Sequence, residues 1–202
     1  KIVVNSGNGA AGPTLDSIVA EMSKNQSKVK FEKLHHNVDS SFPHGIPNPL
    51  LPETHFWTRN KILETGSDFG VAFDGDFDRC FFFDEKGDFV PSQYVVALLA
   101  RVFLLNEPGA IIVHDPRAIW NIQDMVKATG GKSILSLTGH AFVKRTMREK
   151  KAVYGGEMSA HHYFRDFNYC DSGMIPWLLI TELMSITGIS LSELVAEQRS
   201  KF

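Results

Sequence analysis

Short apolar segments alternate along this chain with longer segments whose apolar residues recur at the spacing of a helix. The first apolar segment, residues 2–4, predicts a buried strand, and the pattern that begins at Pro13 predicts a helix after it. The same criteria predict further strands at residues 29–34, 69–73, 80–83, 110–113, 133–137 and 153–154. They predict further helices at residues 53–65, 93–105, 119–128, 141–151 and 174–184, and a last helix after Ser190. This alternation is typical of α/β proteins with largely parallel sheets.

The order of predicted elements runs through two cycles, which divide the chain into two similar α/β units at residues 1–90 and 91–202. Each unit has enough residues to bury a core of its own. Four prolines between residues 40 and 52 predict a long loop in the first unit. The chain opens directly in a predicted strand and without Met, so we expect it to be a piece of a longer protein.

Composition and charge exclude several classes of protein. The 202 residues include 21 Lys and Arg against 23 Asp and Glu, which leaves a formal charge of −2 and no basic tract for nucleic acid or a membrane surface. The longest apolar stretches, residues 95–105 and 174–180, fall short of the roughly 18 residues that a membrane span needs. Two cysteines, Cys80 and Cys170, suit a reducing compartment and predict a cytoplasmic protein.

A glycine-rich turn with the spacing GxGxxG, residues 7–12, lies between the first strand and the first helix. A dinucleotide-binding fingerprint would lie at the same place, followed by an acid at the end of the second strand. Here that strand ends in Leu34-His35-His36, and Pro13 removes an amide that would face a phosphate. The pattern favours a structural turn, and a nicotinamide-dependent dehydrogenase stays open as an alternative.

Three carboxylates at every second position, Asp74, Asp76 and Asp78, lie on a turn between two predicted strands. Such a cluster of oxygen ligands suits a hard divalent cation, and we expect Mg²⁺. An EF-hand would need Gly where this chain has Arg79, and its flanking elements would be helices. Because phenylalanines interleave with the acids, an idle surface turn is the poorer interpretation. Arg79 is a candidate to bind a phosphoryl group that the metal also polarises.

A second polar segment, residues 155–162, begins with two glycines and carries Glu157, Ser159 and His161 at alternate positions. In an extended chain these three side chains would project to one side, which suits a polyol ligand. We therefore expect Glu157 and Ser159 to act in ligand binding rather than in fold stability. The pair His161-His162 raises the alternative of zinc, but a Cys or third His at ligand spacing is missing. A polar loop with incidental histidines is the other alternative.

Two further candidates follow predicted strands of the second unit, at the ends where open parallel sheets bind their ligands. Arg117 comes after the strand at residues 110–113, and His140 comes after the strand at residues 133–137. By themselves, these positions also suit a solvated arginine and a histidine at a helix start.

Taken together, these segments resemble the α-D-phosphohexomutases, most closely their bacterial phosphomannomutase branch. Residues 74–79, Asp-Gly-Asp-Phe-Asp-Arg, are similar to the family's magnesium loop, and residues 155–161, Gly-Gly-Glu-Met-Ser-Ala-His, are similar to its sugar loop. Residues 138–140 followed by Lys144, and the opening residues 5–9, are similar to further family segments in the same order. The resemblance covers essentially the whole chain. It implies that the glycine-rich turn opens the second domain of the family and binds no dinucleotide.

The resemblance implies two three-layer α/β units with mainly parallel sheets, like domains two and three of a four-domain enzyme. In that family, domain one carries the phosphoserine loop and domain four the loop for the distal phosphate, so these missing domains are expected partners. The implied reaction interconverts mannose 6-phosphate and mannose 1-phosphate through a bisphosphate and feeds GDP-mannose and surface polysaccharide synthesis. Glucose or dual specificity, and a non-catalytic module that binds Mg²⁺ or a sugar phosphate, stay open. The chain alone is expected to be inactive.

The resemblance also implies residue roles. The three aspartates would bind Mg²⁺, and Arg79 would face the phosphoryl group. Glu157 and Ser159 would bind hydroxyls of the phosphosugar substrate. The cleft would be lined by Arg117, His140 and His161, with His161 a candidate for proton transfer.

Two positions depart from the pattern of many relatives, which have Gly there. Phe77 in the metal loop would narrow the movement of that loop. Ala160 in the sugar loop is similar to the phosphomannomutase branch and favours mannose over glucose.

Overall fold

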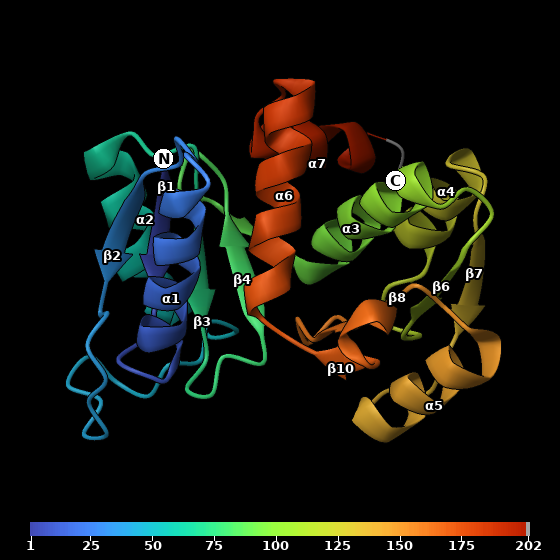
Figure 1. Ribbon diagram of the computed structural model, residues 1–202, viewed down its shortest axis with the longest axis horizontal. Helices are drawn as coiled ribbons and strands as arrows, with labels where there is room; N and C mark the ends of the chain where they lie inside the picture. Colours follow the sequence, from blue (N-terminus) through green and yellow to red (C-terminus); the bar gives the residue numbers. More distant parts are fainter. Residues whose placement is uncertain (201–202) are drawn as a thin grey trace. The chain divides into compact units, whose positions relative to one another are not determined.

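The computed structural model describes residues 1–200, which form two compact units (Figure 1). Unit 1 contains Lys1–Phe89 together with Ser190–Ser192. Unit 2 contains Val90–Ile189 and the described residues from Glu193 on. Each unit is built on one five-stranded sheet.

The sheet of unit 1 combines parallel and antiparallel strands. Its elements are β1 (Ile2–Asn5), α1 (Ala11–Lys24), β2 (Phe31–Leu34), a 3₁₀ turn (Pro52–Thr54), α2 (His55–Thr65), β3 (Phe69–Phe73), β4 (Cys80–Phe83) and β5 (Phe89–Val90). The strand order is β2-β1-β3-β4-β5. β1 pairs in parallel with both β2 and β3, whereas β3 and β4 form an antiparallel hairpin.

Unit 2 repeats this plan and adds helices at both ends. Its elements are α3 (Ser92–Asn106), β6 (Ile111–His114), α4 (Trp120–Ala128), β7 (Lys132–Leu135), α5 (His140–Lys150), β8 (Tyr154–Gly156), β9 (His162–Phe164), a 3₁₀ turn (Arg165–Phe167), β10 (Cys170–Asp171), α6 (Met174–Thr187) and α7 (Leu191–Arg199). The strand order is β10-β9-β8-β6-β7. β6 pairs in parallel with β7 and β8, and β9 pairs antiparallel with β8 and β10.

In unit 1, α1 and α2 cover opposite faces of the sheet, as Figure 1 shows. The reason is that β2 and β3 lie on opposite sides of β1 and that crossovers between parallel strands turn right-handed. β1, β3 and β4 are consequently buried along their whole length. Double burial explains why these strands are continuous apolar runs in the sequence.

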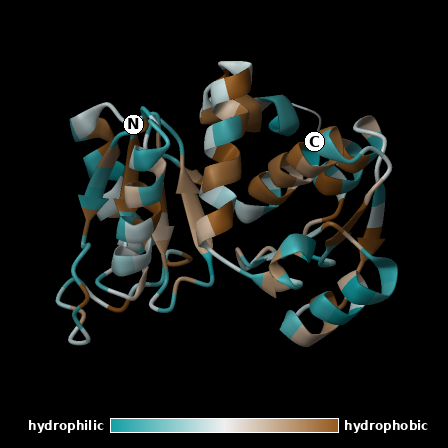
Figure 2. Cartoon of the chain, viewed as in Figure 1, coloured by the Kyte–Doolittle hydropathy of each residue, from teal (hydrophilic) through white to brown (hydrophobic). Residues whose placement is uncertain are grey.

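The same rule places α4 and α5 on opposite faces of the sheet in unit 2, where α3 packs against α4, α6 and β8. Figure 2 shows the consequence for composition: α3 and α6 are mostly hydrophobic, whereas much of α5 is hydrophilic. α3 contributes nine buried residues to the core of this unit, which accounts for its long apolar pattern.

The two-unit α/β architecture is confirmed, and the sheets are mixed rather than mainly parallel. Each sheet has three parallel strands, to which antiparallel strands are added at one edge. A loop as short as residues 74–79 is too short for a parallel crossover, so β4 has to return antiparallel. The sequence patterns missed β5, β9 and β10, because strands of two or three residues are too short to show alternation.

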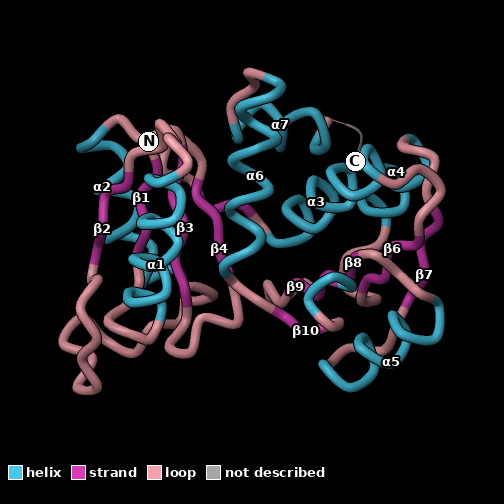
Figure 3. The backbone as a smooth tube through the Cα atoms, viewed as in Figure 1, coloured by secondary structure: helices cyan, strands magenta, loops and turns pink. Residues whose placement is uncertain are grey.

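The proline-rich segment is a loop, as predicted: Figure 3 shows neither helix nor strand between β2 and the 3₁₀ turn at Pro52–Thr54. Within residues 1–200, no single helix is long and apolar enough to cross a membrane. α6 and α7, which lie at 90° to each other, meet that length and composition only as a joined pair.

Candidate functional site

Two hairpins carry most of the candidate residues, and they occupy equivalent places in the two sheets. One joins β3 to β4 through residues 74–79, and the other joins β8 to β9 through residues 157–161. In chain order, β3 and β8 are the third parallel strands of their sheets. In the sheet, each lies next to the first parallel strand, β3 next to β1 and β8 next to β6. Ligands of α/β sheets bind outside the carboxyl ends of the strands where the strand order reverses. Both hairpins begin at such a place.

The hairpin between β3 and β4 brings the three predicted metal ligands together. Asp74, Asp76 and Asp78 each offer a carboxylate oxygen, and these oxygens lie within 4.8 Å of one another. Asp74 is buried directly after β3, whereas Asp76 is exposed at the tip of the turn. A group of oxygen ligands that is buried at one side and open at the other suits a hard divalent cation.

Arg79 closes the same hairpin and pairs with its first acid. Its Nε donates to Asp74 Oδ2 at 2.6 Å and lies 3.8 Å from Asp78 Oδ1. The guanidinium also lies 5.8 Å from the ring centroid of Phe81. The positive charge of Arg79 therefore offsets part of the repulsion among the carboxylates and lies beside them, where it can meet an anionic group.

The glycine-rich turn supports this hairpin through backbone contacts. The Ala10 N–H donates to the Gly75 carbonyl at 2.9 Å. A Cβ atom on Gly9 would lie 2.5 Å from that carbonyl oxygen, and one on Gly12 would lie 2.1 Å from the His36 oxygen. Close approach of two backbones explains these two glycines. The spacing that suggested a dinucleotide fingerprint is thus accounted for by packing.

The hairpin between β8 and β9 gathers Glu157, Ser159 and His161, although not as an extended chain. The Ala160 N–H donates to the Glu157 carbonyl at 3.1 Å and closes a turn, so the expected extended conformation is wrong. The three side chains still meet, because His161 Nδ1 lies 2.9 Å from Ser159 Oγ and 3.7 Å from Glu157 Oε2. The turn, and not strand alternation, produces the polar cluster.

Glu157 is 2% exposed and forms two strong hydrogen bonds. Its Oε1 accepts from the Gly139 N–H at 2.8 Å, and its Oε2 accepts from the Tyr163 hydroxyl at 2.6 Å. The carboxylate therefore ties its hairpin to the loop before α5 and to β9. The expectation that Glu157 has no part in fold stability is revised by these contacts.

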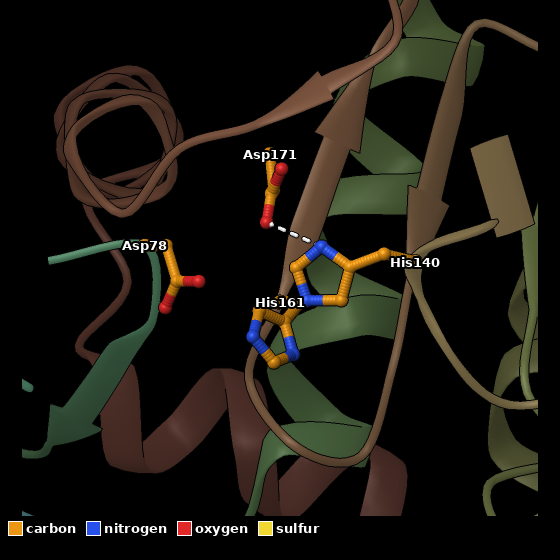
Figure 4. A group of neighbouring side chains, drawn as sticks. All are labelled: Asp78, His140, His161 and Asp171. Atoms are coloured by element: carbon orange, nitrogen blue, oxygen red, sulfur yellow. Dashed lines mark ion pairs between the residues drawn. The ribbon is translucent and has the colours of Figure 1, made fainter. Parts of the chain in front are cut away.

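His140, the first residue of α5, faces the same cluster (Figure 4). Its ring centroid lies 4.3 Å from that of His161, and its Nδ1 lies 3.1 Å from Asp171 Oδ2. The other oxygen of Asp171 accepts from Lys144 Nζ at 2.8 Å. Burial raises the pKa of Asp171, but the hydrogen bond from Lys144 and the nearby positive charge hold that pKa below its usual value. Asp171 is therefore a carboxylate at neutral pH.

Arg117 is attached to the same hairpin through Asp115. Asp115 is fully buried after β6, and its carboxylate accepts from the Arg117 backbone N–H and from Arg117 Nε, both at 3.0 Å. Asp115 Oδ2 also accepts the Met158 N–H at 3.1 Å. One buried carboxylate thus holds both the arginine and the second residue of the hairpin.

Comparison with known proteins identifies the family to which this fold and these loops belong. Residues 91–202 match the family model for phosphoglucomutase/phosphomannomutase alpha/beta/alpha domain III, and residues 1–87 match the model for domain II. The chain belongs to the phosphoglucomutase/phosphomannomutase family. The resemblance noted in the sequence is confirmed.

Individual members of the family agree with this assignment. The chain is 58% identical over 202 residues to a phosphomannomutase from Salmonella montevideo, of which it spans 44% of the length. A family protein from Burkholderia thailandensis superposes with a TM-score of 0.80 at 32% identity, over 87% of this chain and 37% of that one. An N-acetylphosphoglucosamine mutase from Aspergillus fumigatus, in complex with GlcNAc-6P and magnesium, shares the fold with a TM-score of 0.72 at 15% identity, over 96% and 48%.

Sequence reasoning missed the supporting residues of this family fold. Asp115 follows β6 at the carboxyl end of the sheet, so its position carried a signal that went unused. Asp171 and Tyr163 carried none, because both lie on strands that the sequence patterns did not predict. These three residues hold Arg117, His140 and Glu157, respectively.

Proposed function

We propose that this chain is the central part of a phosphomannomutase that interconverts mannose 6-phosphate and mannose 1-phosphate. The observation that carries the proposal is the pair of equivalent hairpins: one gathers three carboxylates and an arginine, and the other gathers a carboxylate, a hydroxyl and an imidazole. The chain spans 44% of the length of the relative named phosphomannomutase. We therefore assign the phosphoserine donor and the distal-phosphate loop to domains one and four of a longer protein.

In this proposal residues 1–90 are the domain with the metal loop and residues 91–202 the domain with the sugar loop. Asp74, Asp76 and Asp78 would hold Mg²⁺, because their oxygens already lie within 4.8 Å of one another and form an all-oxygen donor set. When bound, Mg²⁺ supplies positive charge that stabilises a phosphoryl group in transfer. The Arg79 guanidinium, held against Asp74 at 2.6 Å, binds oxygens of the same phosphoryl group.

The second hairpin binds and orients the sugar. Glu157 accepts hydrogen bonds from sugar hydroxyls, because an ionised carboxylate has about four acceptor positions and only two are used by Gly139 and Tyr163. Ser159 offers a hydroxyl that both donates and accepts. These contacts set the orientation of the bound sugar.

The cationic and imidazole side chains complete the substrate site. Arg117 remains 46% exposed while Asp115 fixes its orientation, so its guanidinium can bind a phosphate or a sugar oxygen. His161 exchanges a proton with the reacting hydroxyl, and Ser159 orients its ring through Nδ1. His140 lies edge-on to His161 and lines the same side of the site.

Three parts of the proposal concern the setting of the enzyme. The product feeds GDP-mannose and surface polysaccharide synthesis. The enzyme works in the cytoplasm, in keeping with two cysteines in 202 residues. The 202-residue chain alone is inactive, since transfer needs a phosphoryl donor that sits in another domain. Family membership displaces the dehydrogenase alternative. The remaining alternatives are a phosphoglucomutase or dual-specificity enzyme and a non-catalytic module that binds Mg²⁺ or a sugar phosphate.

The test is an assay of the whole protein with mannose 6-phosphate and glucose 6-phosphate, each with Mg²⁺ and bisphosphate activator. We expect mannose 6-phosphate to be the better substrate, and Asp76→Asn to lower kcat by about a hundredfold or more. Asp88→Asn is the matched control, because Asp88 is an exposed acid of the same unit that pairs with Arg59. Exclusive turnover of glucose 6-phosphate would replace the mannose assignment, and full activity of Asp76→Asn would contradict the metal role.

A further inference from the structure

Unit 2 contains a second cluster of metal-ligating side chains, which differs in chemistry from the three aspartates. It consists of His140 at the start of α5, His161 in the hairpin and Asp171 on β10 (Figure 4). One ring nitrogen of each histidine and one carboxylate oxygen of Asp171 lie within 4.8 Å of one another. His140 Nδ1 and Asp171 Oδ2 are already 3.1 Å apart.

The donor set of this cluster fits a borderline transition metal rather than Mg²⁺. Two imidazoles and one carboxylate are ligands that Zn²⁺, Co²⁺ and Ni²⁺ accept readily, whereas Mg²⁺ prefers oxygen alone. Adjacent ligands of a tetrahedral zinc lie about 3.4 Å apart, so donor atoms that lie within 4.8 Å of one another need to close by at most about 1.4 Å. Three protein ligands leave one position for water or another ligand, as in open zinc sites.

Neighbouring groups hold the ligands in orientations that suit a metal. Lys144 Nζ binds the second oxygen of Asp171 at 2.8 Å, and Ser159 Oγ lies 2.9 Å from His161 Nδ1. Such outer contacts orient metal ligands in known sites. The side chain of His140 is 44% exposed, which gives an ion a way in, while those of His161 and Asp171 are 15% and 11% exposed.

The adjacent histidine in the sequence is not part of the cluster. His162 is fully buried, its Nδ1 lies 2.6 Å from the Tyr154 hydroxyl, and its ring stacks on Tyr154. The vicinal pair of histidines therefore supplies one ligand, His161. Its two partners lie far away in the sequence: His140 comes 21 positions earlier and Asp171 comes 10 positions later.

We propose that unit 2 binds a zinc-class divalent ion through His140, His161 and Asp171. The binding itself does not depend on the proposed function. Its consequence does: because the ion would engage the imidazoles assigned to the sugar and to proton transfer, zinc-class ions inhibit the enzyme even when Mg²⁺ is saturating.

The experiment titrates the 202-residue chain with Zn²⁺ by calorimetry and with Co²⁺ by visible absorption. We expect one ion to bind per chain and excess Mg²⁺ to leave it bound. His140→Gln and Asp171→Asn should each weaken binding by more than about tenfold. Asp76→Asn is the matched control, since it removes an acid of the other cluster, and it should bind Zn²⁺ like the wild type.

Circular dichroism of each variant shows whether it is folded, and His161→Gln replaces any variant that is not. Equal Zn²⁺ affinity in the wild type and in the folded His140, His161 and Asp171 variants would overturn the proposal, as would loss of binding in Asp76→Asn. Because no substrate is present, these outcomes are independent of whether the whole protein proves to be a mutase. Inhibition of the whole enzyme by Zn²⁺ that Asp171→Asn removes would support the consequence.

Discussion

The hairpins after β3 and β8 have the same backbone design and different chemistry. Each begins with a carboxylate that is almost fully buried, Asp74 at 3% and Glu157 at 2% exposure. In each, the fourth residue donates its N–H to the carbonyl of the first and has a left-handed backbone, with φ of 52° at Phe77 and 69° at Ala160. A left-handed backbone costs conformational free energy in every residue that has a Cβ atom, whereas glycine adopts it freely. This cost accounts for the glycine that many relatives are expected to have there.

The partner of the buried carboxylate is what differs. Asp74 pairs with a cation of its own hairpin, Arg79, whereas Glu157 accepts from a backbone N–H and a tyrosine hydroxyl supplied by neighbouring segments. The first hairpin therefore presents a charged cluster that depends little on the rest of its unit. In the second hairpin, uncharged donors bind the carboxylate, and the geometry of the cluster depends on several loops. In the proposed function, the same sheet position serves a metal and a phosphoryl group in one unit and a sugar in the other.

The two units should differ most in how much stability they lose when the residue just after their first parallel strand is mutated. Asp115 and Ser6 occupy this equivalent position, and both are fully buried. Asp115→Ala removes the acceptor for Arg117 and for the Met158 N–H and should lower the free energy of unfolding by about 2–3 kcal/mol.

Ser6→Ala is the matched control for Asp115→Ala, and urea unfolding measures both variants. The Ser6 hydroxyl has no hydrogen-bond partner among residues 1–200, so its loss should change the free energy of unfolding by less than about 0.5 kcal/mol. Equal destabilisation by the two variants would show that the Asp115 contacts do not organise the second hairpin.

Acidification should also destabilise the two units to different extents. Burial, with a smaller effect of His161, lowers the pKa of His162 to about 3, and burial lowers that of His114 as well. Below pH 6.5 the unfolded chain binds a proton at His162 that the folded chain excludes, so stability falls as the pH falls. The loss is about 1.4 kcal/mol per pH unit, or about 2 kcal/mol at pH 5 from His162 alone.

In unit 1 the pKa of His35 is lowered to about 4, first by burial and then by His44, but this side chain is only partly buried. Unit 2 thus has two histidines of lowered pKa, His114 and His162, against His35 in unit 1, so amide hydrogen exchange at pH 7 and pH 5 should show a larger loss of protection in β8 and β9 than in β1 and β3. His162→Asn should remove most of the difference. An equal loss in both units of the wild type would contradict this assignment.

The smallest effect concerns the buried carboxylate of the second hairpin. Glu157→Gln replaces one acceptor oxygen by an amide and weakens one of the bonds to Gly139 and Tyr163, so we expect the free energy of unfolding to fall by about 1 kcal/mol. Ser159→Ala in the same hairpin should cost less than about 0.5 kcal/mol. Thermal unfolding measures both, and no change in Glu157→Gln would return Glu157 to a role in ligand binding alone.

Much of the fold could be predicted from the sequence because its signals are local. The apolar runs of β1, β3 and β4 and the helical spacing of α3 identify these elements without any long-range contact. The acidic hairpin was equally visible, since all its residues lie within the six positions from Asp74 to Arg79. β9 and β10 were not, because strands of two or three residues exist only through pairing, β9 with β8 and β10 with β9.

By itself, then, the sequence determined the α/β units, the acidic hairpin and the polar character of the second hairpin. The tertiary structure decided which groups meet around that second hairpin: Asp115 with Arg117 and Met158, Gly139 with Glu157, and Asp171 with His140. The physical reason is distance along the chain. Except for Asp115 with Arg117, these contacts join residues from 18 to 43 positions apart, and no local periodicity or turn signal encodes such a pairing. Only the folded sheet brings the ends of β6, β8 and β10 close enough for hydrogen bonds to form.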